Sequence, residues 1–139
     1  MTAIERLWEE WTLPIRDALH YADGRSYALT PAAPTGFTVL APFDLDATLE
    51  DDPSWVSSVD GLTVADLGER GLLWAGEGSY GSEGFLARLT TGHALLWAVF
   101  FAESNPFDRI RVSENVATFR STLGIEIAVD IDDPRRWER

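Results

Sequence analysis

The sequence contains no cysteine, no lysine and only two histidines among its 139 residues. Without cysteine there is no disulfide and no thiolate chemistry. Because all 11 basic residues are arginine, Schiff-base catalysis and a P-loop lysine are excluded. A closed structural zinc site takes three or four Cys, His or carboxylate ligands, so none is expected here. We therefore predict no bound metal and no cofactor.

Basic side chains are scarce: 11 arginines stand against 23 acidic residues, with a formal net charge of −12 and a pI of about 4.4. The arginines are spread singly along the chain, except at Arg135, Arg136 and Arg139. Nucleic acids and anionic membrane surfaces attract clustered basic residues, so neither is an expected partner. No apolar run approaches the ~18–20 residues that span a bilayer, and no signal peptide is recognisable. The expected location is the cytoplasm.

Apolar residues, by contrast, are frequent enough for one folded domain. The chain is 45% hydrophobic and 12% aromatic, which is too rich for a disordered segment. A single core usually serves about 100–200 residues. We predict one domain over residues 1–139, with an N-terminal helix at 1–23, a mainly β region at 25–131 and a tail at 132–139.

The N-terminal helix is predicted from a capping signal and an apolar face. Thr2 and Glu5 have the spacing of a capping box. Apolar residues then recur at helical spacing, at Ile4, Leu7, Trp8 and Trp11. Pro14 cannot donate a helical hydrogen bond, so a kink or restart is expected there. We expect Trp8 and Trp11 to pack this helix on one face of a sheet.

Alternating apolar residues predict antiparallel strands in most of the remaining chain. The clearest alternation covers residues 125–131, and similar patterns cover 37–43 and 85–89. The apolar run Ala94–Ala102 is typical of a central strand that is buried on both faces. The predicted fold class is therefore α+β: an antiparallel, meander-like β-sheet of about five to seven strands with the N-terminal helix packed on one face.

Three segments are harder to assign. Residues 44–53 are acidic and rich in turn formers, and we interpret them as an exposed loop. Residues 54–70 fit either short strands or one helical turn. Residues 114–122 fit a return strand or a helix capped by Ser113, and their β-branched content favours the strand.

Residues Gly76–Gly81 match the pattern G-x-G-x-x-G. A dinucleotide site needs a helix after this pattern, whereas Gly84–Thr90 has the alternation of a strand. We therefore expect a glycine-rich hairpin or bulge. The alternative function places a small hydrolase or ligand-binding enzyme at the Gly76–Gly84 loop, and that enzyme would need a pocket there with a carboxylate of raised pKa.

Acidic residues concentrate before Trp55, and aromatic residues next to carboxylates are suited to a basic partner. The predicted partner-binding patch consists of Asp44, Asp46, Glu50, Asp51, Asp52 and Trp55. A second candidate patch consists of Glu77, Tyr80 and Glu83. The leading hypothesis is a non-enzymatic protein that binds a basic protein partner, with exposed charge raising the association rate and the aromatic ring slowing release.

In size, acidity, absence of cysteine and α+β layout, the chain is similar to small bacterial immunity proteins. This resemblance in general properties implies an immunity-like or antitoxin-like inhibitor that caps a basic protein. It rests on no residue motif, so it assigns no functional residues. A homodimer that pairs through an exposed strand edge is a further alternative.

Overall fold

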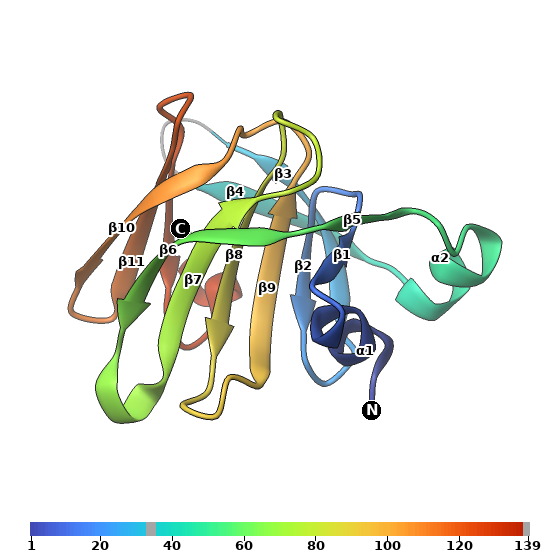
Figure 1. Cartoon of the computed structure of the whole chain (residues 1–139), viewed down its shortest axis with the longest axis horizontal. Helices are drawn as coiled ribbons and strands as arrows, with labels where there is room; N and C mark the ends of the chain where they lie inside the picture. The colour runs from blue at the N-terminus through green and yellow to red at the C-terminus, as the bar shows by residue number, and fades with distance from the viewer. Residues whose placement is uncertain (33–35, 138–139) are drawn as a thin grey trace.

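The computed structural model describes residues 1–32 and 36–137, which form three antiparallel β-sheets and two short α-helices (Figure 1). The largest sheet has seven strands in the order β4-β3-β2-β9-β8-β7-β6. Its strands are β2 (Ala18–Tyr21), β3 (Ser26–Pro31), β4 (Phe37–Pro42), β6 (Asp60–Asp66), β7 (Leu72–Glu77), β8 (Gly84–Leu89) and β9 (Leu95–Phe101). Two meanders, β2 to β4 and β6 to β9, meet where β2 pairs with β9.

The remaining elements flank this sheet. A three-stranded sheet contains β10 (Phe107–Ser113), β11 (Val116–Ser121) and β12 (Glu126–Asp130), and a two-stranded sheet pairs β1 (Thr12–Pro14) with β5 (Val56–Ser58). The helices are α1 (Ala3–Glu9) and α2 (Leu45–Asp51), with 3₁₀ turns η1 (Gly68–Arg70) and η2 (Pro134–Trp137). Neither α-helix of the described residues has the length and apolar character needed to cross a membrane.

Side chains on the two faces of the large sheet belong to two separate cores. In β9, Trp97 and Val99 pack with Phe119 of β11 and other residues of the three-stranded sheet. Ala98 and Phe100 point the other way and pack with Ile4 and other residues near the N-terminus. This alternation is the two-residue period of a β-strand with both faces covered. β9 lies in the middle of the sheet, as its apolar run predicted.

The α+β class and the dominance of antiparallel sheet are confirmed, but the N-terminal prediction is wrong in extent. The capping box of Thr2 and Glu5 is present, yet α1 ends at Glu9. Trp11 takes a φ of +56°, which leaves the helical path, and β1 follows. All four residues of β2 are buried, so this strand lacks the alternation that would have identified it.

The structure also decides the segments that the sequence left open. Residues 114–122 contain strand β11 and no helix, whereas 54–70 contain β5, β6 and η1. The predicted loop at 44–53 is wrong, because it holds α2, whose first turn is capped by the Asp44 side chain accepting from the Ala47 amide at 3.1 Å. The largest sheet has seven strands, within the predicted range of about five to seven, but the described residues form twelve strands in three sheets where a single sheet was predicted. The predicted tail, residues 132–139, contains η2. Residues 138–139 lie outside the described part of the chain.

Candidate functional site

Aromatic side chains from α1, from Trp11 and from strands β7 and β8 form one cluster. The Trp8 ring is buried, and its centroid lies 6.0 Å from that of Phe85 and 6.1 Å from that of Trp74. Trp11 packs edge-on against Trp74, with centroids 4.8 Å apart. These edge-to-face arrangements are the favourable geometry for aromatic pairs. The cluster therefore fixes the position of its outermost member, Trp11.

Trp11 is the exposed end of this cluster, with 45% of its surface accessible. Its positive φ is unusual for a bulky residue, and backbone hydrogen bonds hold it there. The Trp11 amide donates to the Trp8 carbonyl at 2.9 Å, and the Trp11 carbonyl accepts from the Val59 amide at 2.8 Å. Trp11 was expected to pack as part of the N-terminal helix. Its ring does contact Trp74, but the residue lies beyond the end of α1, where the helical spacing argument no longer applies.

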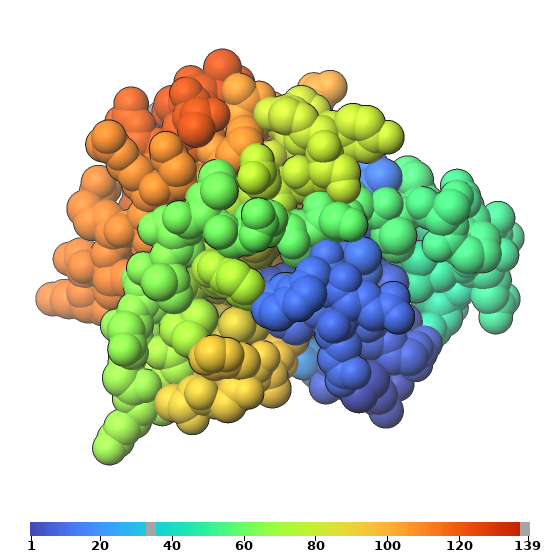
Figure 2. All heavy atoms as spheres, viewed as in Figure 1, coloured from blue at the N-terminus to red at the C-terminus, as the bar shows by residue number. Residues whose placement is uncertain are grey.

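Apolar residues of β6 continue this surface. Leu62 and Val64 are 46% and 59% exposed, and Val64 lies directly opposite Trp74 in the β6–β7 pair. A Cβ at Gly61 would lie 1.9 Å from the Trp74 Nε1 atom, so the missing side chain of Gly61 makes room for the indole. We call this surface the tryptophan face, made up of Trp11, Leu62, Val64 and Trp74. Figure 2 shows the side of the molecule on which β6 and the N-terminal segment lie next to each other at the surface.

Exposed carboxylates border the tryptophan face. Glu9 and Glu10 directly precede Trp11 in the chain, and Asp60 and Asp66 begin and end β6. All four residues are exposed. An apolar centre with a charged rim is the usual composition of a protein–protein contact surface.

The first predicted patch lies on one projecting segment. Figure 1 shows α2 extending away from the sheets at one end of the molecule. Its carboxylates are exposed and Trp55 is half-buried, in a set that comprises Asp44, Asp46, Glu50, Asp51, Asp52 and Trp55. Among the ion pairs of the described residues, this segment takes part only in the contact of Arg6 with Asp46, at 4.0 Å. The segment therefore keeps most of its negative charge facing solvent.

The second predicted patch is divided between the surface and the interior. Tyr80 is 66% exposed, but Glu83 is only 3% exposed, and Glu77 is half-buried. The Glu83 Oε1 atom accepts from the Ser57 hydroxyl at 2.6 Å and from the Tyr80 amide at 3.2 Å. Glu83 therefore faces inward in this structure, and the interpretation of it as a surface carboxylate is corrected. The sequence suggested exposure because Glu83 stands between polar and glycine residues.

The glycine-rich segment connects β7 to β8 as a hairpin, as its pattern predicted. Ser57 of β5 accepts from the Ser79 amide at 2.8 Å, and the Ser58 amide donates to the Ser79 hydroxyl at 3.0 Å. Together with the Glu83 contact, these bonds tie the hairpin to β5. Because a strand follows the glycines, they do not form the helix N-terminus that a dinucleotide site requires.

The His20 side chain in β2 is fully buried. Its Nδ1 atom lies 2.8 Å from the Ser26 hydroxyl, and its ring packs edge-on against Phe43. Burial, with a smaller effect from the Arg16 charge, lowers the pKa of His20 to about 3. The imidazole is therefore neutral at physiological pH and belongs to the core.

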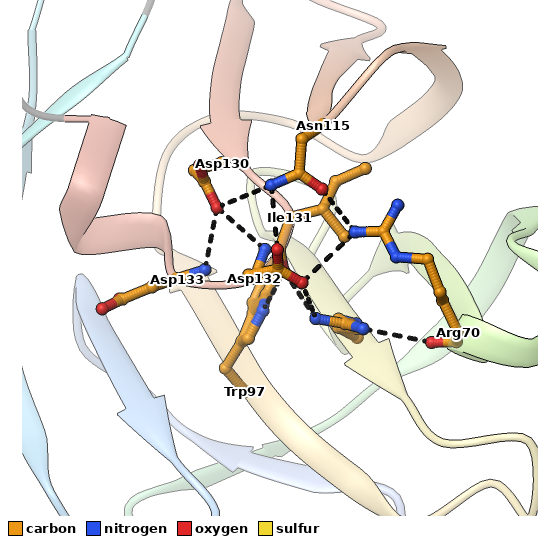
Figure 3. Close-up of polar contacts among 8 residues, drawn as sticks. Arg70, Trp97, Asn115, Asp130, Ile131, Asp132 and Asp133 are labelled. Atoms are coloured by element: carbon orange, nitrogen blue, oxygen red, sulfur yellow. Dashed lines mark hydrogen bonds and ion pairs between the residues drawn. The ribbon is translucent and has the colours of Figure 1, made fainter.

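Asp132 occupies the centre of a polar cluster between β12 and the large sheet (Figure 3). Its Oδ1 atom lies 3.0 Å from Arg88 and 3.2 Å from Arg70, and its Oδ2 atom accepts from Asn115 at 3.0 Å. Although burial acts to raise it, these hydrogen bonds hold the pKa of Asp132 below its usual value. The carboxylate is thus already paired within the protein.

Backbone contacts complete this junction between the sheets. The Ile131 carbonyl accepts from the Trp97 indole at 3.0 Å (Figure 3). It also accepts from Arg88 at 3.1 Å. The cluster therefore has a structural role, and within the described residues no three His, Asp or Glu side chains lie together as metal ligands would.

Comparisons with known proteins give this chain no relative. No protein-family model, no curated protein and no solved structure matches it.

Proposed function

We propose that this protein binds a basic protein partner through the tryptophan face. The observation that carries the proposal is the apolar surface of exposed Trp11, Leu62 and Val64 beside half-buried Trp74, with acidic residues around it. In this proposal α1 packs on one face of the large sheet and holds Trp11 against Trp74.

The energetic argument concerns Trp11. A bulky residue at positive φ costs on the order of 1–3 kcal/mol, and exposing its ring to water adds to that cost. A binding role accounts for both costs, because tryptophan is strongly enriched among the residues that dominate binding energy at protein interfaces. Trp11 replaces Trp55 as the proposed anchor, since Trp55 is half-buried.

The negative charge of the chain favours a basic partner. Two copies of a chain with a net charge of −12 repel each other, and like charges placed together at an interface cost several kcal/mol. A basic partner instead gains attraction from the rim of the tryptophan face and from the α2 segment. The charge complementarity therefore favours a basic protein over a second copy. The enzymatic alternative at the Gly76–Gly84 loop stays a prediction.

The first experiment identifies the partner and tests the contact. Wild-type protein and a Trp11→Asn variant are used as bait in extracts of the native host, and retained proteins are identified and their pI values compared. Asparagine tolerates a positive φ, so this substitution removes the ring and keeps the backbone. We expect a basic protein on the wild-type bait in near-equal ratio, with at least about tenfold weaker binding to the variant.

Leu123→Asn is the matched control, because Leu123 is also exposed but lies on the turn between β11 and β12. Calorimetry with the purified partner should give the control the affinity of the wild type. A retained partner of acidic pI, or equal affinity for wild type and Trp11→Asn, would refute the proposal.

A further inference from the structure

Three arginines, two from β10 and one from β11, share one face of the three-stranded sheet. In the β10–β11 pair, Arg109 lies opposite Arg120 and Arg111 lies opposite Thr118. Residues directly opposite each other in an antiparallel pair project to the same side. Phe119, between Thr118 and Arg120, is fully buried in the core, so its two neighbours point outward. We call this outward surface of Arg109, Arg111, Thr118 and Arg120 the arginine face.

The arginine face lies beside a depression of about 450 Å³. Besides the residues of the arginine face, Thr63 and the carboxylates of Asp108 and Glu126 line this depression. Thr63 comes from β6, which ends the large sheet, and β10 ends the three-stranded sheet and lies next to β6. The depression is therefore built where two sheet edges approach each other, and its volume lies in the range of small-molecule sites.

Within the described chain, two of the three arginines of this face, Arg109 and Arg111, lack a carboxylate partner of the kind that Arg25 and Arg88 have. Arg25 pairs with Asp23 at 2.9 Å, and Arg88 pairs with Asp132 at 3.0 Å. On the arginine face, the ion pairs of the described residues include one contact, between Arg120 and Glu126 at 3.7 Å. Arg109 and Arg111 take part in no side-chain hydrogen bond or ion pair with any described residue.

This arrangement is unfavourable by itself. Like charges directly opposite each other across a β-pair are destabilising, and Arg109 faces Arg120 in this way. The chain has about two acidic residues for each basic one, so unpaired arginines at one place are not a consequence of composition. Glu126 offsets this repulsion only on the side of Arg120, and an external anion between the arginines would reduce it further.

We propose that the arginine face binds the phosphate group of a small phosphate ester. A guanidinium group donates two parallel hydrogen bonds to a phosphate, and the hydroxyls of Thr63 and Thr118 are further donors in the same depression. A phosphate monoester carries up to two negative charges and three terminal oxygens, which match several guanidinium groups better than a carboxylate does. The depression is larger than one phosphate, which leaves space for the organic part of the ester. This proposal does not depend on the partner-binding function.

Nuclear magnetic resonance of the arginine side chains tests the proposal with the full-length chain. Ribose 5-phosphate, inorganic phosphate and acetate are titrated separately at constant ionic strength, and the Nε–Hε signals are followed. We expect saturable shifts of Arg109, Arg111 and Arg120 with ribose 5-phosphate, weaker binding of inorganic phosphate and no saturation with acetate.

A charge-matched pair of variants separates a specific site from general attraction. Arg109→Gln/Arg111→Gln should weaken ribose 5-phosphate binding at least about tenfold, whereas Arg6→Gln/Arg25→Gln should leave it unchanged while removing the same two charges. Arg6 and Arg25 are both exposed and lie outside the depression. Circular dichroism establishes that each variant is folded.

Several outcomes would overturn this inference. They are the absence of saturable binding by any phosphate, equal weakening in the two double variants, and saturation by acetate at the same concentrations as ribose 5-phosphate. If inorganic phosphate binds as tightly as the ester, the organic part has no role and the proposed ligand class is wrong.

Discussion

At the scale of single residues, His20 shows how burial converts a titratable group into a pH-dependent element of stability. Its neutral ring bonds to Ser26 through Nδ1, and its buried Nε2 atom has no hydrogen-bond partner among the described residues. The pKa of His20 is about 3 in the folded protein, against 6.5 for an unperturbed histidine. Between about pH 3 and pH 6.5, His20 is therefore mostly protonated in the unfolded chain and mostly neutral in the folded protein.

The sign of the effect follows from this difference. Stability that is fully present above pH 6.5 is lost as the pH falls toward 3, by up to about 1.4 kcal/mol for each pH unit. We expect His20→Gln to be less stable at neutral pH but to lose less stability between pH 6 and pH 4 than the wild type does. Urea unfolding at several pH values measures both slopes. Equal slopes for the two proteins would show that His20 is not the titrating group.

At the scale of secondary-structure elements, the link between β12 and the large sheet depends on Asp132. Arg88, which reaches Asp132 from β8, is half-buried, and removing its partner leaves a charge without compensation. We expect Asp132→Asn to lower the free energy of unfolding by about 2 kcal/mol, the range of a hydrogen bond to a charged group.

Asp23→Asn is the matched control for this prediction. It breaks an ion pair with Arg25 in which both side chains are largely exposed, and exposed pairs contribute about 0–1 kcal/mol. Denaturant unfolding should therefore rank Asp132→Asn as clearly less stable than Asp23→Asn. Similar losses in the two variants would mean that the junction contributes no more than a surface ion pair.

At the scale of the whole molecule, the parts that could be predicted are those whose signal is local. The Thr2–Glu5 capping box, the apolar run of β9 and the glycine hairpin each depend on neighbouring residues, and each is present in the structure. β2 was missed because both of its faces are buried, which removes the alternation that reveals a half-buried strand.

The surfaces could be predicted less well than the elements. The exposure of Trp11 depends on a backbone φ that the sequence does not reveal. The inward direction of Glu83 depends on Ser57, which is 26 positions away. The arginine face depends on the register that places Arg109 opposite Arg120. The acidic segment around α2 was recognised because its charge is contiguous in the chain.

We propose that exposed charge attracts a basic partner and that the tryptophan face retains it. The most direct test is the kinetics of binding to the captured partner at increasing ionic strength. Screening shortens the reach of exposed charges, and we predict that the association rate constant of the wild type falls steeply with salt. Trp11→Asn should keep this salt dependence and dissociate at least about tenfold faster. An association rate that does not respond to salt, or an unchanged dissociation rate in Trp11→Asn, would contradict the account.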